Sequence, residues 1–203
     1  MLKLYYSPGA CSLASHIALR EAGLDFQLER VDGRAKKTAS GEDYWAVTPK
    51  GYVPALRLDS GEVLTEGTAI MPYIADQKPS ARLASGDSPM VRHRVQEWLG
   101  YLNSEVHKGF GPFFSPATTD EQKAAARTAL GKKFDFVQKE LGDRPYLLGA
   151  GFTIADAYLF TVLGWCALVG IDLAQWPALK VYHARVAARP AVLAAMQAEG
   201  LVK

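Results

Sequence analysis

Apolar and polar positions alternate in two short stretches near the start of the chain, residues 2–6 and residues 26–31. Alternation with a period of two is the pattern of a half-buried strand. Between these stretches, apolar positions recur every three to four residues from Ser12 onward, and Gly23 follows them, which predicts a helix that ends there. The order of these elements is βαβ.

The pattern then changes to two shorter strands and a second helix. Residues 42–47 suit one short helix, and residues 55–58 and 62–64 suit two strands joined by a glycine-containing turn. A helix is expected to follow over residues 65–77, with Pro72 inside it. Because proline lacks an N–H and clashes with the preceding turn, we expect a kink or a later helix start. The whole segment reads βαβ–ββα.

Strand signals stop at a segment rich in Pro, Gly and Ser, residues 78–88, which suits a linker. Helical spacing dominates beyond it, for example over residues 123–141, and residues 152–169 are apolar nearly all round, as in a buried central helix. The predicted fold class is an α/β thioredoxin-like domain over residues 1–77 followed by an all-helical domain over residues 89–203.

Composition excludes several classes of protein. The formal net charge of the 203 residues is +2, without a long basic run, which argues against a nucleic-acid partner. The only cysteines, Cys11 and Cys166, suggest neither a disulfide framework nor a metal site. Free thiols fit a reducing compartment, and the most apolar run, residues 157–171, is too short to span a bilayer. We expect a cytoplasmic protein that binds neither a metal nor a membrane.

Cys11 and Ser12 lie where the first strand passes into the first helix. Unpaired N–H groups and the positive end of the helix dipole favour a thiolate at such a place, so we expect a Cys11 pKa below about 8.5. The alternative is a buried, unreactive cysteine. Ser12 is either a helix-capping residue or a donor to a bound sulfur.

Two further places in the N-terminal half suit ligand binding. Val53 precedes Pro54 just before a strand, a candidate cis bond, although the residues alone favour trans. Glu66 begins a helix whose first N–H groups, at Gly67 and Thr68, suit a carboxylate, while Glu66 itself suits an ammonium group. Taken alone, Glu66 is an ordinary first-turn glutamate that balances the helix dipole.

Together these features resemble the thioredoxin fold joined to an all-helical domain, the architecture of the cytosolic glutathione S-transferases. The run Tyr5-Tyr6-Ser7-Pro8-Gly9-Ala10-Cys11-Ser12-Leu13 is similar to the bacterial beta class, whose signature residue is this cysteine. Four further segments match motifs of the family, namely residues 48–54, 64–67, 104–110 and 152–158.

The resemblance implies an enzyme that binds glutathione, favours its thiolate and conjugates it to a hydrophobic electrophile, acting as a homodimer. It also implies site residues. The catalytic candidates are Cys11, His107, Ser12 and Tyr6. The glutathione-binding candidates are Ala10, Cys11, Lys36, Tyr52, Val53, Pro54, Glu66, Gly67, Thr68, Asn103, Glu105, His107 and Lys108. The candidates for the hydrophobic substrate are Phe110, Phe113, Phe114 and Trp165.

The resemblance gives some of these residues a specific role. Val53 would pair its backbone with the cysteinyl unit of glutathione through a cis Pro54, Lys36 would approach the glycine carboxylate, and Glu105 would reach the glutathione of a partner subunit. His107 would sit beside the Cys11 thiol.

The helical half is consistent with these roles. Asn103, His107, Phe110 and Phe114 form one stripe if the helix keeps its phase. Without the resemblance, His107 would be read as a surface or core histidine and the aromatic residues as core. Thr153, three residues before Asp156, predicts a capping box with a purely structural role.

Other functions remain open. A glutathione-dependent thiol–disulfide reductase would act through a mixed disulfide between Cys11 and glutathione. A reductive dehalogenase would use the same cysteine site to displace halide from chlorinated aromatics. A non-enzymatic binding or regulatory protein would keep the fold without the chemistry.

Overall fold

The computed structural model describes residues 1–84 and 88–203. Residues 85–87, part of the expected linker, lie outside the described residues. The N-terminal half contains a five-stranded sheet in the order β3-β2-β1-β4-β5. Its strands are β1 (Leu2–Tyr6), β2 (Phe26–Asp32), β3 (Lys37–Thr38), β4 (Ala55–Arg57) and β5 (Val63–Thr65). β1 and β2 run parallel, and the other neighbouring pairs are antiparallel.

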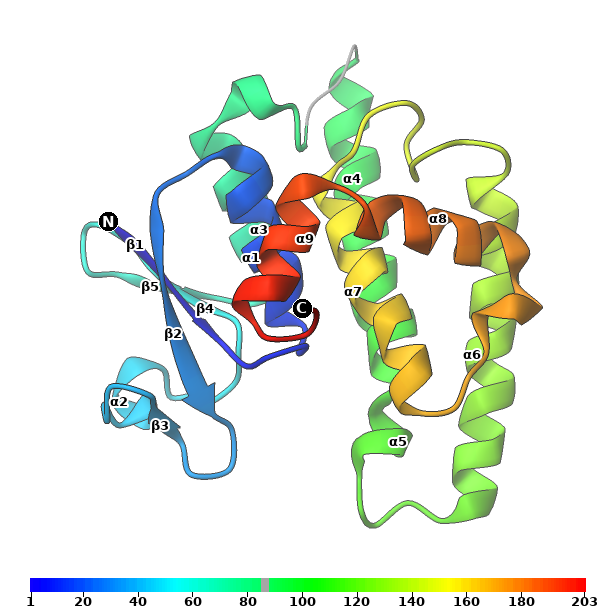
Figure 1. Cartoon of the computed structure of the whole chain (residues 1–203), viewed down its shortest axis with the longest axis horizontal. Helices are drawn as coiled ribbons and strands as arrows, with labels where there is room; N and C mark the ends of the chain where they lie inside the picture. Colours follow the sequence, from blue (N-terminus) through cyan, green and yellow to red (C-terminus); the bar gives the residue numbers. More distant parts are fainter. Residues whose placement is uncertain (85–87) are drawn as a thin grey trace.

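Helices α1 (Ser12–Ala22) and α3 (Gly67–Gln77) pack against each other beside the sheet, and the short helix α2 (Tyr44–Val47) lies on the far side of it (Figure 1). Gly23 ends α1 in the left-handed conformation, at φ +64°. The βαβ–ββα order is confirmed, with one addition, since the two-residue strand β3 has no pattern long enough to predict it.

Most of the remaining helices form the other half of the molecule, on the right in Figure 1. They are α4 (Pro89–Tyr101), α5 (Gly111–Phe114), α6 (Asp120–Leu141), α7 (Ile154–Leu168) and α8 (Pro177–Ala187). The last helix, α9 (Pro190–Ala198), lies in the middle of the view and packs against α1. Two 3₁₀ turns, Pro79–Ala81 and Leu173–Gln175, and a π-helical segment, Leu102–His107, complete the elements of the described chain. None of the helices described has the length and apolar character needed to cross a membrane.

Helix α7 is central and buried nearly all round, as its composition predicts. It packs against α1 of the sheet half and against α4 and α8 of the helical half. The largest hydrophobic core therefore runs continuously from the inner face of the sheet through α1 and α3 into the helical half. A second, smaller cluster of five buried residues lies at the other face of the sheet, at α2: Tyr5, Val31, Tyr44, Val47 and Ala55.

Pro72 lies inside helix α3. The helix begins at Gly67, two residues after the expected start, and continues through Pro72 to Gln77. Ile70 and Ile74, on either side of the proline, are completely buried, and burial of such side chains offsets the loss of one backbone hydrogen bond.

Candidate functional site

The turn between β1 and α1 carries Cys11, directly before the helix. The Cys11 thiol donates a hydrogen bond to the carbonyl oxygen of Val53, at 3.3 Å. The Val53–Pro54 peptide bond is cis, as the family resemblance implied. Trp165 of α7 donates from its indole nitrogen to the Gly9 carbonyl, at 2.8 Å, so the central helix holds the turn in place.

Two cavities meet at this cysteine. The first, which we call the polar cavity, has a volume of about 360 Å³. It is lined by Cys11, Lys50, Tyr52, Val53, Pro54, Thr65, Glu66, Asn103, His107, Lys108 and Tyr158. The second, the apolar cavity, has a volume of about 440 Å³. It is lined by Pro8, Gly9, Ala10, Cys11, His107, Lys108, Gly111, Phe114, Trp165 and Leu168.

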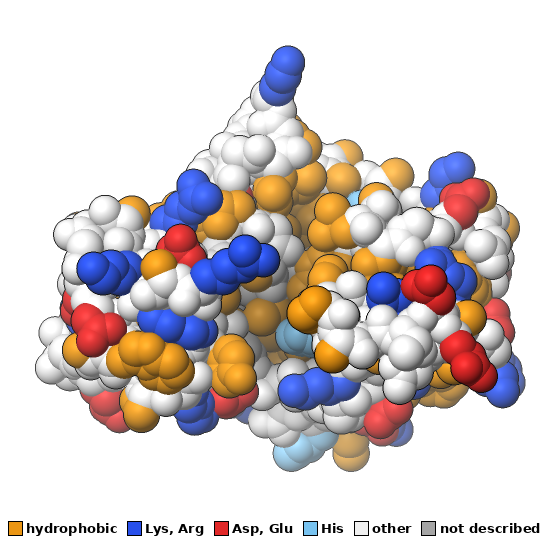
Figure 2. Space-filling view, turned by 90° about the horizontal axis from the view of Figure 1, so that it is seen from below, with side chains coloured by type: hydrophobic (Ala, Val, Ile, Leu, Met, Phe, Trp, Pro, Cys, Tyr) orange, Lys and Arg blue, Asp and Glu red, His pale blue; other side chains and the backbone are white. Residues whose placement is uncertain are grey.

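Cys11, His107 and Lys108 line both cavities. Both cavities take residues from the sheet half and from the helical half, and Figure 2 shows the surface hollowed between these two halves. A molecule with a polar body and a reactive sulfur would thus place that sulfur beside an apolar compartment.

The ionisation of Cys11 differs from the expectation. Burial raises the pKa of the Cys11 thiol to about 11, and the backbone N–H groups of Cys11 and Ser12 and the charge of Lys108 only partly oppose it. The prediction of a lowered pKa was therefore wrong. The helix start supplies the donors, but the cost of removing a thiolate from water is larger. At neutral pH Cys11 is a thiol that donates a hydrogen bond.

His107 is held from the opposite side of the site. Its Nδ1 lies 2.6 Å from the hydroxyl oxygen of Tyr158, and that hydroxyl donates to the side-chain oxygen of Asn103 at 3.0 Å. Because the single Tyr158 proton is used on Asn103, Nδ1 of His107 carries the proton and its Nε2 is left as an acceptor.

The ionisation of His107 is also determined by its surroundings. Burial, and to a smaller extent the charge of Lys108, lower the pKa of His107 to about 4, so the ring is neutral at pH 7. His107 therefore cannot stabilise a thiolate as a cation, and Lys108 is the cation that lines both cavities.

The helix that carries His107 does not keep its phase. After α4, the π-helical segment Leu102–His107 widens the turn, and the chain bends before α5. Asn103 and His107 line the polar cavity, whereas Phe110 is fully buried and Phe114 is 54% exposed in the apolar cavity. The expected single stripe is therefore divided.

Eight of the glutathione-binding candidates line the polar cavity together: Cys11, Tyr52, Val53, Pro54, Glu66, Asn103, His107 and Lys108. Ala10 lines the apolar cavity instead. Gly67 and Thr68 form the first turn of α3, directly after Glu66. These last two line neither cavity.

Lys36 and Glu105 lie apart from both cavities. The Lys36 ammonium donates to the Gly51 carbonyl at 2.7 Å. The Glu105 carboxylate pairs with Lys133 at 3.0 Å, on the surface of the helical half.

Two of the catalytic candidates are placed elsewhere. The Ser12 side chain is completely buried, and its hydroxyl accepts from the Ser7 N–H and donates to the Ser7 carbonyl, both at 3.2 Å. Its role is to close the turn before α1. Tyr6 is buried in the core, where its ring centre lies 6.3 Å from that of His16. Neither residue lines the polar or the apolar cavity.

Two of the four aromatic candidates line the apolar cavity, Phe114 and Trp165. Phe110 lies behind them, with its ring centre 5.4 Å from that of Trp165, and supports the wall. Phe113 packs under the guanidinium of Arg127 instead. The π-helical segment and the turn into α5 decide which of these rings faces the cavity.

Three residues of the polar cavity were missed as site residues: Lys50, Thr65 and Tyr158. Lys50 pairs with the Glu66 carboxylate at 2.8 Å. Lys50 and Tyr158 both lie inside segments that match the family. The sequence of these segments does not show that Tyr158 packs beside His107, because the two residues come from different helices.

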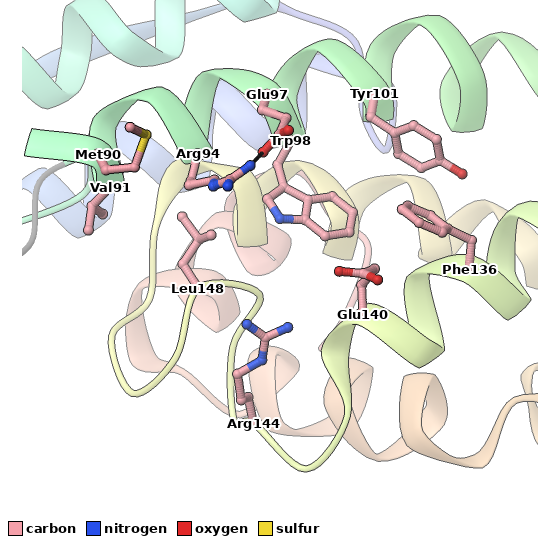
Figure 3. Close-up of a pocket in the computed structure, with 10 residues that line it drawn as sticks. All are labelled: Met90, Val91, Arg94, Glu97, Trp98, Tyr101, Phe136, Glu140, Arg144 and Leu148. Carbon is pink, nitrogen blue, oxygen red and sulfur yellow. Dashed lines mark hydrogen bonds and ion pairs between the residues drawn. The ribbon is translucent and has the colours of Figure 1, made fainter.

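A larger cavity lies elsewhere, with a volume of about 580 Å³, between α4, α6 and the segment after α6. Figure 3 shows the Trp98, Tyr101 and Phe136 rings along one side of it and the Arg94–Glu97 ion pair above. It holds neither a thiol nor any predicted site residue. The described chain also contains no group of His, Cys, Asp and Glu side chains that would hold a metal.

Comparison with known proteins gives consistent matches over the whole chain. The family described as Glutathione S-transferase, N-terminal domain, matches residues 9–77, and the one described as Glutathione S-transferase, C-terminal domain, matches residues 101–190. Glutathione S-transferase GstA of Escherichia coli O157:H7 is 50% identical over 200 residues, covering 98% of this chain and 100% of the relative.

Solved structures agree. The structure of a sphingomonad glutathione S-transferase complexed with glutathione is 52% identical, with a TM-score of 0.94, and covers 98% of this chain and 100% of its own. The bacterial beta class glutathione S-transferase of Sphingomonas chungbukensis has the same identity, TM-score and coverage.

Proposed function

Because this chain belongs to the glutathione S-transferase family, we propose that its polar cavity binds glutathione and its apolar cavity binds the electrophile. Its activity is that of a beta-class glutathione S-transferase, with glutathione as co-substrate. The alternatives, a thiol–disulfide reductase, a dehalogenase or a non-enzymatic binding protein, are not supported by these relatives.

One observation carries the assignment of the polar cavity. The Cys11 thiol, the Val53 backbone and the Glu66 carboxylate line the same cavity, although they come from three separate segments. Glu66 suits the ammonium group of the γ-glutamyl unit, and the first-turn N–H groups of α3 suit its carboxylate. Two cations suit the glycine carboxylate: Lys50, which lines the polar cavity with Tyr52, and Lys36, whose ammonium lies 5.5 Å from the centre of the Tyr52 ring.

Cys11, Lys108 and His107 each have a role at the glutathione sulfur. When glutathione binds, the Cys11 thiol turns its single proton from the Val53 carbonyl to the glutathione thiolate, and Lys108 adds a positive charge. His107 Nε2 accepts the proton that leaves the glutathione thiol, as a general base. The thiolate then forms the sulfur–carbon bond with an electrophile in the apolar cavity, and its leaving group departs. Holding both reactants beside Cys11 adds proximity.

The apolar cavity favours a flat, hydrophobic electrophile. Trp165 and Phe114 stand perpendicular, at 87° with ring centres 5.8 Å apart, and Leu168 is 72% exposed next to them. An aromatic ring that packs against Trp165 would bury this apolar surface.

A homodimer stays a prediction, and the α4–α6 face is its best-suited surface (Figure 3). Met90 and Phe136 are 56% and 44% exposed there. Charges of both signs border the aromatic rings, namely Arg94, Glu97, Glu140 and Arg144, which suits contact with a second copy of the same surface. Sedimentation that finds a monomer at micromolar concentration would contradict this.

Other sequence predictions also stay predictions. They are the boundaries at residues 77 and 89, the contact of Glu105 with the partner's glutathione, the absence of a metal, and a cytoplasmic location, which the two free cysteines favour.

Calorimetry with glutathione and an assay with an aromatic halide test the proposal. We expect binding to the wild type and conjugation that survives, reduced, in Cys11→Ala, because the nucleophile is the sulfur of glutathione. Cys11→Ser, which keeps a donor, should retain more activity than Cys11→Ala. Turnover of disulfides alone, lost in Cys11→Ala, would favour the reductase. Binding without any turnover would favour a non-enzymatic protein.

A further inference from the structure

The backbone just before Val53 is fastened by two side chains from outside the cavities. The Lys36 ammonium donates to the Gly51 carbonyl at 2.7 Å, and the Tyr44 hydroxyl donates to the Tyr52 carbonyl at 2.8 Å. The two anchors are also joined to each other, since the Tyr44 N–H donates to the Lys36 carbonyl at 2.8 Å. Two consecutive carbonyls of the loop are thus tied to one unit.

Helix α2 makes a third contact with the same loop, between Trp45 and Gly51. Gly51 has a φ of +63°, and a Cβ at this position would lie 2.6 Å from the Trp45 ring. Only glycine allows both this conformation and this approach. Tyr44 and Trp45, adjacent in α2, therefore hold the loop together.

Tyr44 is well suited to act as a fixed donor. Its side chain is completely buried in the small cluster at α2, with its ring centre 5.7 Å from that of Tyr5. Burial raises the pKa of Tyr44, so the hydroxyl keeps its proton at any pH used for an assay. Tyr44 lines neither the polar nor the apolar cavity, so any effect on a ligand passes through the loop.

We propose that Tyr44 is a positioning residue for glutathione: its bond to the Tyr52 carbonyl orients the peptide that presents the Val53 backbone to the polar cavity. The inference rests on the proposed glutathione site and adds a residue to it. The peptide plane of Tyr52 and Val53 includes both the bonded carbonyl and the Val53 N–H, so fixing one orients the other.

The chain offers a matched control in Tyr5. Tyr5 is also completely buried in this cluster, and its hydroxyl donates to Glu42 at 3.2 Å instead of to the loop. Tyr44→Phe and Tyr5→Phe each remove one buried hydroxyl and leave the ring. Both should be compared with the wild type by calorimetry with glutathione, steady-state kinetics and thermal unfolding.

We expect Tyr44→Phe to raise the Kd and the KM for glutathione roughly threefold to tenfold, as for one lost hydrogen bond. Its kcat at saturating glutathione should change by less than about twofold, because the bond acts on binding. Tyr5→Phe should leave the Kd for glutathione within about twofold of the wild-type value, even if it lowers the melting temperature as much as Tyr44→Phe does. Amide exchange at Gly51, whose N–H donates to the Thr48 carbonyl, should quicken only in Tyr44→Phe.

Equal shifts of Kd in the two variants would reduce Tyr44 to a structural role and overturn the proposal, as would an unchanged Kd in folded Tyr44→Phe. If Tyr44→Phe does not fold, Gly51→Ala disturbs the same loop through Trp45 and should raise the Kd while kcat is kept. An unchanged Kd in that variant would also overturn the proposal. A wild type that fails to bind glutathione contradicts the proposed function itself, which separates the two failures.

Discussion

The Tyr158 hydroxyl oxygen lies 2.6 Å from Nδ1 of His107, and this bond joins the central helix α7 to the π-helical segment after α4. Since Tyr158 also donates to Asn103, three side chains form one unit on the wall of the polar cavity. These contacts determine that Nδ1 of His107 carries the proton and that Nε2 is free to accept one.

Replacing Tyr158 with Phe should lower kcat about fivefold, the effect of losing one hydrogen bond of about 1 kcal/mol that orients the proposed base. KM for glutathione should change less, because Tyr158 is only one of many residues that line the cavity. Tyr146→Phe is a suitable control, since Tyr146 bonds to Arg189 at 2.8 Å and lines neither cavity of the site. Equal losses of kcat in the two variants would exclude a role through His107.

The alkylation of Cys11 by iodoacetamide should show no plateau near pH 8.5. Burial raises the pKa of Cys11 to about 11, so the thiolate fraction, and with it the rate, should rise about tenfold per pH unit from pH 7 to pH 10. The measurement needs a Cys166→Ser background. A small free thiol is the reference, because its alkylation rate reaches a plateau near its own pKa. A similar plateau in the alkylation rate of Cys11 would contradict the buried-thiol assignment.

Glu66→Ala should weaken glutathione binding by about 1.5 kcal/mol, roughly tenfold. This value is at the lower end of the range for a charge-assisted hydrogen bond. The Glu66 side chain is 62% exposed, and its carboxylate already forms an ion pair with Lys50. Calorimetry is the measurement, and Glu62→Ala, an exposed glutamate in the neighbouring hairpin, is the control. Unchanged affinity in folded Glu66→Ala would contradict the assigned role.

Thr153→Ala should lower the free energy of unfolding by about 1 kcal/mol, with activity per folded molecule unchanged. The capping box at α7 is confirmed: the Asp156 carboxylate accepts from the Thr153 N–H at 2.8 Å and from its hydroxyl at 2.9 Å. Asp156 also accepts from Leu147 and Tyr182, so Asp156→Ala should cost more.

Thr119→Ala, at the exposed capping box of α6, provides the comparison and should cost less. Chemical denaturation measures all three variants. A denaturation midpoint that does not move in Thr153→Ala would show that this box contributes nothing to stability.

Much of the fold follows from patterns within a few residues of one another. The period of two over residues 2–6, the helical spacing that Gly23 ends and the Thr153–Asp156 box are local, and each element forms where its own pattern places it. Such features depend on backbone geometry, capping and turn chemistry, which neighbouring residues determine. The place of Glu66 at the start of α3, directly before its first turn, and the place of Cys11 before α1 were likewise readable from the sequence.

The chemistry of the site depended on contacts between distant segments. The local helix start predicted a thiolate at Cys11, but burial of the thiol raised its pKa, against the opposing charge of Lys108. His107 became neutral for the same reason, and its partner Tyr158 lies 51 residues further along the chain. Desolvation and pairing of this kind arise only when separate elements pack together, so they belong to the tertiary structure and leave no periodic trace in the sequence.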